Sequence, residues 1–137
     1  MADNRVVFVD TNYWIALLLP KDNNHVSANN LKSTLFSAKM VTSELVLAEF
    51  LNFFSKKGHF RTVAHKAVVA LRQHPNIVIV SFAETPFDEA FDQYGSYPDK
   101  EWSLVDCSSF CLMRKRSISS AASYDKHFQQ SGFEIIS

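Results

Sequence analysis

Short, mostly apolar segments recur along the chain, and stretches with helical spacing separate them. The first apolar segment is Val6 to Val9, and it is apolar at every position rather than at alternate ones. Continuous apolarity is typical of strands that are covered on both faces of a sheet. We predict five strands, within residues 5–10, 40–42, 76–80, 118–124 and 133–136. Helices are predicted at 13–19, 25–37, 45–57, 60–74, 85–95 and 103–116.

This alternation of strands and helices restricts the fold class. Strand–helix–strand units connect by right-handed crossovers and give a parallel sheet sandwiched between helices. We therefore predict a three-layer α/β/α domain with a central, mostly parallel five-stranded sheet. The chain has 137 residues, of which 47% are hydrophobic and 20% charged, which suits one compact domain over residues 1–137.

Charge and cysteine content exclude several classes of protein. The 14 basic and 14 acidic side chains balance, so the chain as a whole is neither a polycation nor a polyanion. Its two cysteines, Cys107 and Cys111, supply neither a disulfide framework nor the four ligands of a structural zinc site. The apolar runs are far shorter than the roughly 18 residues that span a bilayer. We expect a soluble, cytoplasmic protein.

Two acids directly follow apolar runs. Asp10 follows the first predicted strand, and Asp125 ends the fourth. In open α/β sheets, ligands bind beyond the carboxyl ends of the strands, so these two carboxylates are candidates for a functional site. An Asp between a strand and a helix is also a common helix N-cap, and this alternative stays open for both residues.

Two further acids lie inside apolar helical segments, where an unpaired carboxylate is unfavourable. Glu49 has apolar neighbours on most sides of its helix, and Asp106 is flanked by Val105 and Cys107. A buried ion pair is the structural alternative for Glu49. The spacing of Ser103 and Asp106 matches a capping box, which is the structural alternative for Asp106.

The predicted topology could bring all four acids to one end of the sheet. Clustered carboxylates repel one another, and a hard divalent cation with oxygen ligands relieves that repulsion. We therefore expect a Mg²⁺ or Mn²⁺ site. Such a site activates water and offsets charge on a phosphate, so hydrolysis of a phosphodiester is the expected reaction.

The four acids stand in blocks whose order and spacing resemble a PIN domain over nearly the full length of the chain. The blocks are VFVDTN at 7–12, TSELVLAE at 42–49, WSLVDCSSF at 102–110 and SYDKHFQQSGF at 123–133. The chain is most similar to the small members of this family that are typified by the VapC toxins of type II toxin–antitoxin pairs. In one respect the chain departs from the family pattern, because Val105 stands where many relatives have a hydroxyl residue before the acid.

The resemblance implies a metal-dependent endoribonuclease. The acids that it places around one or two Mg²⁺ or Mn²⁺ ions are Asp10, Glu49, Asp106 and Asp125. It further implies supporting roles behind these ligands for Thr11 or Asn12, and an antitoxin protein that covers the groove leading to the acids. We also expect a homodimer, because residues 13–19 and 45–54 carry more apolar surface than one small sheet can cover.

The neutral total charge conceals a basic segment. Residues 50–83 contain no Asp or Glu and five Lys or Arg. We interpret Lys56, Lys57 and Arg61 within it as contacts to RNA phosphates. The alternative is an ordinary solvated helix surface.

Several aromatic and histidine side chains invite a role in RNA binding, but packing is the favoured interpretation. Phe50, Phe53 and Phe54 follow helical spacing, which is more typical of a core or an interface than of base stacking. For His127, beside Asp125, an exposed histidine is the favoured expectation, and a contact with phosphate is the alternative.

Two other classes of function stay open. One is a non-catalytic RNA-binding or interaction module with the same fold. The other is an aspartyl phosphatase of the haloacid dehalogenase type with Asp10 as nucleophile, although such enzymes need a second Asp two residues later, where this chain has Asn12.

Overall fold

Five strands form one sheet in the computed structural model, which describes residues 5–137. The strands are β1 Val6–Val9, β2 Lys39–Ser43, β3 Ile77–Val80, β4 Ser120–Ala122 and β5 Glu134–Ile136. Their order is β3-β2-β1-β4-β5, and neighbouring strands pair in parallel throughout. The predicted five-stranded sheet is confirmed, and it is parallel throughout rather than mostly parallel.

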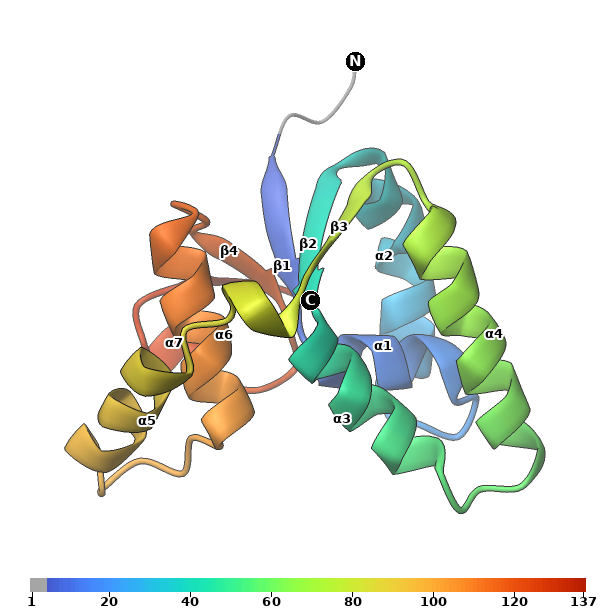
Figure 1. The fold of residues 1–137 in the computed structure, drawn as a ribbon. Coiled ribbons are helices and arrows are strands. Elements are labelled where there is room, and N and C mark those ends of the chain that lie inside the picture. The colour runs from blue at the N-terminus through green and yellow to red at the C-terminus, as the bar shows by residue number, and fades with distance from the viewer. Residues whose placement is uncertain (1–4) are drawn as a thin grey trace.

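Helices cover both faces of this sheet (Figure 1). One group comprises α1 Thr11–Leu18, α2 His25–Ser37, α3 Glu44–Phe54 and α4 His59–Gln73. The opposite group comprises α5 Phe87–Ser96, α6 Leu104–Lys115 and α7 His127–Gln130, and a 3₁₀ turn at Phe82–Glu84 leads into it. The three-layer prediction is confirmed. The sequence pattern missed α7 because four residues are too few to show a helical period.

The strand order determines where a ligand site can form. The chain proceeds outward from β1 to β2 and β3, and then crosses the sheet to β4 and β5. Neighbouring strands β1 and β4 therefore continue into helices on opposite faces, and a crevice opens at their carboxyl ends. Val9 pairs with Ala122 at this edge, so Asp10 lies directly beyond β1 and Asp125 lies three residues beyond β4.

Aromatic side chains join the central strand to the α6–α7 layer. The Phe8 and Phe128 ring centroids lie 6.1 Å apart, and those of Phe110 and Phe128 lie 5.0 Å apart. All three side chains are fully buried. Cys107 and Cys111 are buried and unpaired, as expected for core residues. Within residues 5–137, no helix is both long and apolar enough to cross a membrane.

The homodimer stays a prediction, and packing within the chain covers much of the apolar surface from which it was inferred. Apart from Phe53, the apolar side chains of residues 13–19 and 45–54 are buried or partly buried, because α1 and α3 pack against neighbouring helices as well as against the sheet. Exposed aromatic side chains lie instead on the 3₁₀ turn and on α5, at Phe82, Phe87, Phe91 and Tyr94.

Candidate functional site

The four predicted acids line one cavity of about 360 Å³. They reach it from four separate segments: the β1–α1 junction, α3, α6 and the loop after β4. The remaining lining residues are Thr11, Asn12, Ile15, Phe53, Glu101, Ser103 and His127. The topology therefore brings together residues that are more than one hundred positions apart.

Asp10 is the most buried of the four acids, with 5% of its surface exposed. It occupies the N-cap position of α1, but its side chain accepts no capping hydrogen bond, so the capping alternative is wrong for this residue. The Ser123 hydroxyl donates to its Oδ2 at 3.0 Å. Burial and the nearby Asp106 carboxylate raise the pKa of Asp10 from 3.8 to about 7. Without a cation, ionising this side chain is therefore unfavourable.

Glu49 faces the same cavity from α3 and accepts a hydrogen bond from the Thr11 hydroxyl. In the part of the chain that the structure describes, no cationic side chain forms an ion pair with Glu49, so the ion-pair alternative is wrong. Burial is the main cause that raises the pKa of Glu49, and the Asp106 carboxylate adds to it. The contact places the Thr11 hydroxyl beside the Glu49 carboxylate, and the supporting role of Thr11 stays a prediction.

Asp106 has a structural role as well as a place in the cavity. It forms a complete capping box with Ser103, in which the Ser103 N–H donates to Asp106 Oδ2 and the Asp106 N–H donates to Ser103 Oγ, both at 3.0 Å. The predicted capping box is thus confirmed, because both of its hydrogen bonds are present. It does not exclude function, because these contacts and the one to His127 use Oδ2 and leave Oδ1 available.

His127 links two of the acids, and the expectation of an exposed histidine is wrong. Its Nδ1 lies 3.0 Å from Asp106 Oδ2 and 3.1 Å from Asp125 Oδ2, and its side chain is 15% exposed. Its backbone N–H also donates to Asp125 Oδ1 at 3.2 Å. The unexpected helix α7 carries this histidine to the start of α6, which is why the sequence pattern did not reveal it.

Two polar side chains hold the loop after β4 against the β1–α1 junction. Asn12 Oδ1 accepts the Tyr124 N–H at 3.0 Å, and Ser123 Oγ accepts the Asp125 N–H at 3.1 Å. Asn12 therefore ties this loop to the start of α1, and its supporting role in the site stays a prediction. The sequence reasoning missed Ser123, which is fully buried between Asp10 and Asp125. The available signal was a hydroxyl residue at the end of an apolar strand, two positions before an acid.

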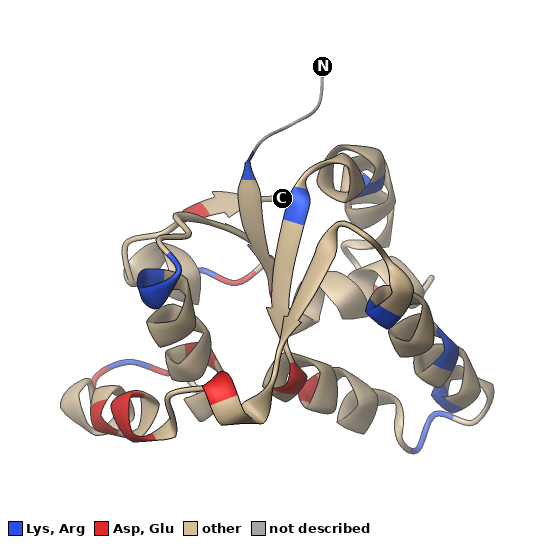
Figure 2. Cartoon of the chain, turned by 45° about the horizontal axis from the view of Figure 1, so that its top comes forward, with Lys and Arg blue, Asp and Glu red and all other residues tan. Residues whose placement is uncertain are grey.

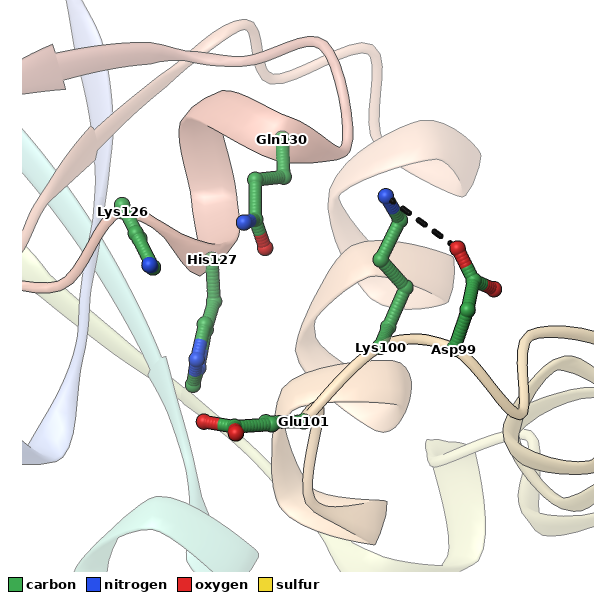
Figure 3. Close-up of a pocket in the computed structure, with 6 residues that line it drawn as sticks. All are labelled: Asp99, Lys100, Glu101, Lys126, His127 and Gln130. Carbon is green, nitrogen blue, oxygen red and sulfur yellow. Dashed lines mark ion pairs between the residues drawn. The ribbon is translucent and has the colours of Figure 1, made fainter.

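A side pocket adjoins the acid cavity (Figure 3). Glu101 and His127 line both cavities, and in Figure 3 the Glu101 carboxylate points toward His127. The other residues of the side pocket are Asp99, Lys100, Lys126 and Gln130. Neither Glu101 nor the side pocket followed from the sequence, because this loop has no periodic pattern.

The predicted RNA-binding cations do not line the acid cavity. Lys56 and Lys57 are exposed in the turn after α3, and Arg61 is exposed in the first turn of α4. In Figure 2, the turn after α3 is blue, whereas red segments gather where α3 meets the sheet. The basic group therefore lies beyond the end of α3, outside the acid cavity.

The carboxylates around the cavity are oxygen donors of the kind that a hard divalent cation binds. Within residues 5–137, no three His, Cys, Asp or Glu side chains are grouped closely enough to hold an ion as they stand. Mg²⁺, however, keeps several waters and takes only one or two protein carboxylates, and its other ligands come from substrate phosphates. Burial is the main cause that raises the pKa values of Asp10 and Glu49, and a bound cation would offset both that cost and the added repulsion from Asp106. The residues present therefore fit Mg²⁺ or Mn²⁺, with Asp10, Glu49, Asp106 and Asp125 as the candidate ligands.

The chain is similar to a known protein family, to a curated relative and to solved structures. The PIN domain model matches residues 7–134. A Mycobacterium tuberculosis protein named 23S rRNA-specific endonuclease VapC20 is 32% identical over 130 residues, which cover 93% of this chain and 95% of that protein. The crystal structure of VapC20, described as a Sarcin-Ricin loop cleaving toxin, has a TM-score of 0.80 at 28% identity and covers 93% of this chain and 95% of that one. FitAcB from Neisseria gonorrhoeae shares the fold, with a TM-score of 0.67 at 23% identity over 96% of both chains.

Proposed function

The chain belongs to the PIN domain family, and from that premise we propose that it is a metal-dependent endoribonuclease acting as the toxin of a toxin–antitoxin pair. The observation that carries the proposal is the meeting of Asp10, Glu49, Asp106 and Asp125 in one cavity at the carboxyl ends of β1 and β4. Helix capping and ion pairing do not account for this set, because the Asp10 side chain accepts no capping hydrogen bond and Glu49 forms no ion pair with a cationic side chain of residues 5–137.

The chain's own residues prepare the site for a cation and a phosphate. A bound Mg²⁺ or Mn²⁺ would supply an activated water and offset the charge that develops on the phosphate. The Ser123 and Thr11 hydroxyls orient the Asp10 and Glu49 carboxylates by hydrogen bonds. His127 holds the Asp106 and Asp125 carboxylates on either side of one ring nitrogen. These contacts position the acids before substrate arrives, which is the condition for electrostatic catalysis.

RNA is the proposed substrate class, and 23S ribosomal RNA is the first substrate to test. Support comes from VapC20, whose name specifies 23S rRNA and which matches this chain over 93% of its length. A synthetic hairpin with the sarcin–ricin loop sequence, intact ribosomes and total RNA form a graded set of substrates. Sequencing the ends of the fragments would identify the cleaved bond.

The test compares the wild-type protein with Asp10→Asn, Glu49→Gln, Asp106→Asn and Asp125→Asn, using Mg²⁺ or Mn²⁺ and an EDTA control. Each variant should lose at least about 10- to 100-fold in cleavage rate, because even changes behind the ligands of a metal site cost that much. Exposed Asp92 on α5 provides the matched control, and Asp92→Asn should cleave at the wild-type rate. Cleavage that survives EDTA, or four variants with unchanged rates, would refute the proposal. Folded wild-type protein that binds RNA but never cleaves it would favour the non-catalytic module.

The toxin role implies two protein partners. An antitoxin would cover the acid cavity, and co-expression should then suppress both cleavage and growth arrest. A second copy of the chain would form a homodimer, with the exposed aromatic face of α5 as the available apolar surface. Analytical ultracentrifugation that shows only monomer across micromolar concentrations would contradict the dimer.

A further inference from the structure

Phe53 is the one phenylalanine in the FLNFF segment at 50–54 of α3 that the core does not enclose. It is 40% exposed, whereas Phe50 and Phe54 are 2% and 0% exposed. Phe50 and Phe54 pack edge to face, with ring centroids 5.2 Å apart. The Phe53 ring packs edge to face on Phe54, with centroids 4.9 Å apart, so the packing interpretation holds fully for Phe50 and Phe54 and accounts for only part of the Phe53 ring.

Phe53 lies close to the acids of the candidate site. Phe53 lies four residues after Glu49, so the two side chains share one face of α3 about 6 Å apart along its axis. Both side chains line the acid cavity. A single exposed aromatic residue on a protein surface is ordinary. An exposed ring in the wall of a cavity that also contains four carboxylates is a different case, since it lies beside the reacting phosphate of the proposed function.

A cation completes the arrangement. Lys57 follows Phe53 by another four residues, and its Nζ lies 4.6 Å from the Phe53 ring centroid. A carboxylate, an aromatic ring and an ammonium group therefore succeed one another away from the sheet. Figure 2 shows the same gradient, from red where α3 meets the sheet to blue in the turn after α3. Residues 50–83 contain no acid that would repel a phosphate along this path.

We propose that Phe53 is a stacking platform for an unpaired RNA base next to the scissile phosphate, and that Lys57 binds the phosphate on the far side of that base. This inference rests on the proposed function, and it names a subsite of the same cavity. Aromatic side chains stack on the faces of unstacked bases in single-stranded RNA, and alternation of rings with cations is typical of such sites. The flexible Lys57 stem lets its ammonium group leave the ring when a base arrives. RNA rather than a protein is the proposed occupant of this subsite during cleavage, because Phe53 lies between carboxylates and a basic turn. The antitoxin of the proposed function would cover the same cavity when it inhibits the toxin.

Binding measurements in EDTA separate this subsite from catalysis. The probe is a fluorescein-labelled single-stranded RNA of ten nucleotides, compared with the same strand in which all bases are replaced by abasic ribose. Phe53→Leu retains apolar packing but removes the π face, and Phe53→Trp retains that face and adds a fluorescent reporter. Phe91→Leu on α5 is the matched control, since Phe91 is also an exposed aromatic residue. Thermal melts of all variants establish that they are folded.

Phe53→Leu should weaken binding of the intact strand by roughly 5- to 150-fold, which is the effect of losing one stacked base. It should leave binding of the abasic strand unchanged, and Phe91→Leu should change neither. Phe53→Trp should retain affinity, and the intact strand should quench its emission. Equal affinity of Phe53→Leu and wild type for the intact strand, or equal loss for both strands, would overturn the inference. In the first case, a contact with a protein partner would become the better account of Phe53.

These binding measurements distinguish failure of the stacking subsite from failure of the proposed nuclease function. If wild-type protein cleaves RNA with Mg²⁺ or Mn²⁺ while Phe53→Leu binds RNA normally, only the stacking subsite fails. If wild-type protein never cleaves RNA but Phe53→Leu loses affinity for the intact strand alone, the stacking subsite stands and the nuclease proposal fails.

Discussion

Replacing Asp10 by Asn should stabilise the metal-free protein at alkaline pH. Burial and the neighbouring Asp106 carboxylate raise the Asp10 pKa from 3.8 to about 7, so the folded state binds a proton that the unfolded state releases. Between about pH 4 and pH 7, the stability of the wild-type protein must therefore fall as pH rises. An Asn side chain carries no charge, and its amide oxygen can still accept the Ser123 hydrogen bond.

The size of the effect follows from the pKa difference. A difference of about 3 pKa units corresponds to roughly 4 kcal/mol at pH 8, since each unit is worth about 1.4 kcal/mol. Only part of this, about 1 to 2 kcal/mol, is expressed at pH 5, and almost none below pH 4. For a chain of 137 residues, 4 kcal/mol corresponds to a rise in Tm of roughly 10 °C or more.

Urea denaturation in EDTA at pH 5, 6.5 and 8 measures this effect directly. The stability gain of Asp10→Asn over wild type should grow with pH. Asp92→Asn, at an exposed position on α5, should stay within about 0.5 kcal/mol of wild type at every pH. Adding Mg²⁺ should stabilise wild type alone and narrow the gap, because a ligand that binds only the folded state raises its stability. An Asp10→Asn protein that is no more stable than wild type at pH 8, or a gap that does not change with pH, would refute the assignment of a buried, repelled carboxylate.

Three further predictions concern other parts of the molecule. Ser103→Ala should lower the free energy of unfolding by about 1 kcal/mol, because it removes the capping box, and it should slow cleavage, because Asp106 loses its hydrogen-bond partner. Denaturation and cleavage assays measure the two effects, and an unchanged cleavage rate would show that the capping box does not contribute to function. The triple variant Lys56→Ala, Lys57→Ala and Arg61→Ala should reduce the slope of log affinity for single-stranded RNA against log salt by about 2, since each phosphate contact contributes roughly 0.7. An unchanged slope in salt titrations would assign RNA binding to another face. Phe110→Ala should destabilise the fold by roughly 3 to 5 kcal/mol in urea, because Phe110 is fully buried among aromatic rings, and a loss below 1 kcal/mol would contradict its central place.

Local patterns predicted the parts of the fold that local forces determine. Continuous apolar runs identified the strands, and the α2 boundaries at His25 and Ser37 agree with the predicted range. The pattern could not show that α3 ends at Phe54 rather than Lys57, since the end of a helix depends on the packing of its last turn. It also missed α7, whose four residues form a helix because Phe128 is anchored in the core.

Some residues of the candidate site could be predicted from local sequence patterns, and others could not. All four predicted acids line the cavity, because an acid after a strand and an acid within an apolar helix are both local anomalies that a sequence displays. Ser123 and His127 display no such anomaly. Their significance comes from what faces them, and Asp10, which Ser123 contacts, lies 113 positions away in the chain.

The sequence by itself determined which residue types were available and which elements they form, since apolar periodicity and the energetic cost of an unpaired carboxylate operate over a few neighbouring residues. The tertiary structure alone decided which side chains meet. The crossing from β3 to β4 brings the β1–α1 junction, the start of α6 and the segment after β4 together, which makes Asp10 and Asp106 repel each other and lets His127 link two acids. It also decided that Phe53 faces the cavity while Phe54 fills the core, because a rotation of one residue along a helix is about 100° and only the packed neighbours fix the absolute direction.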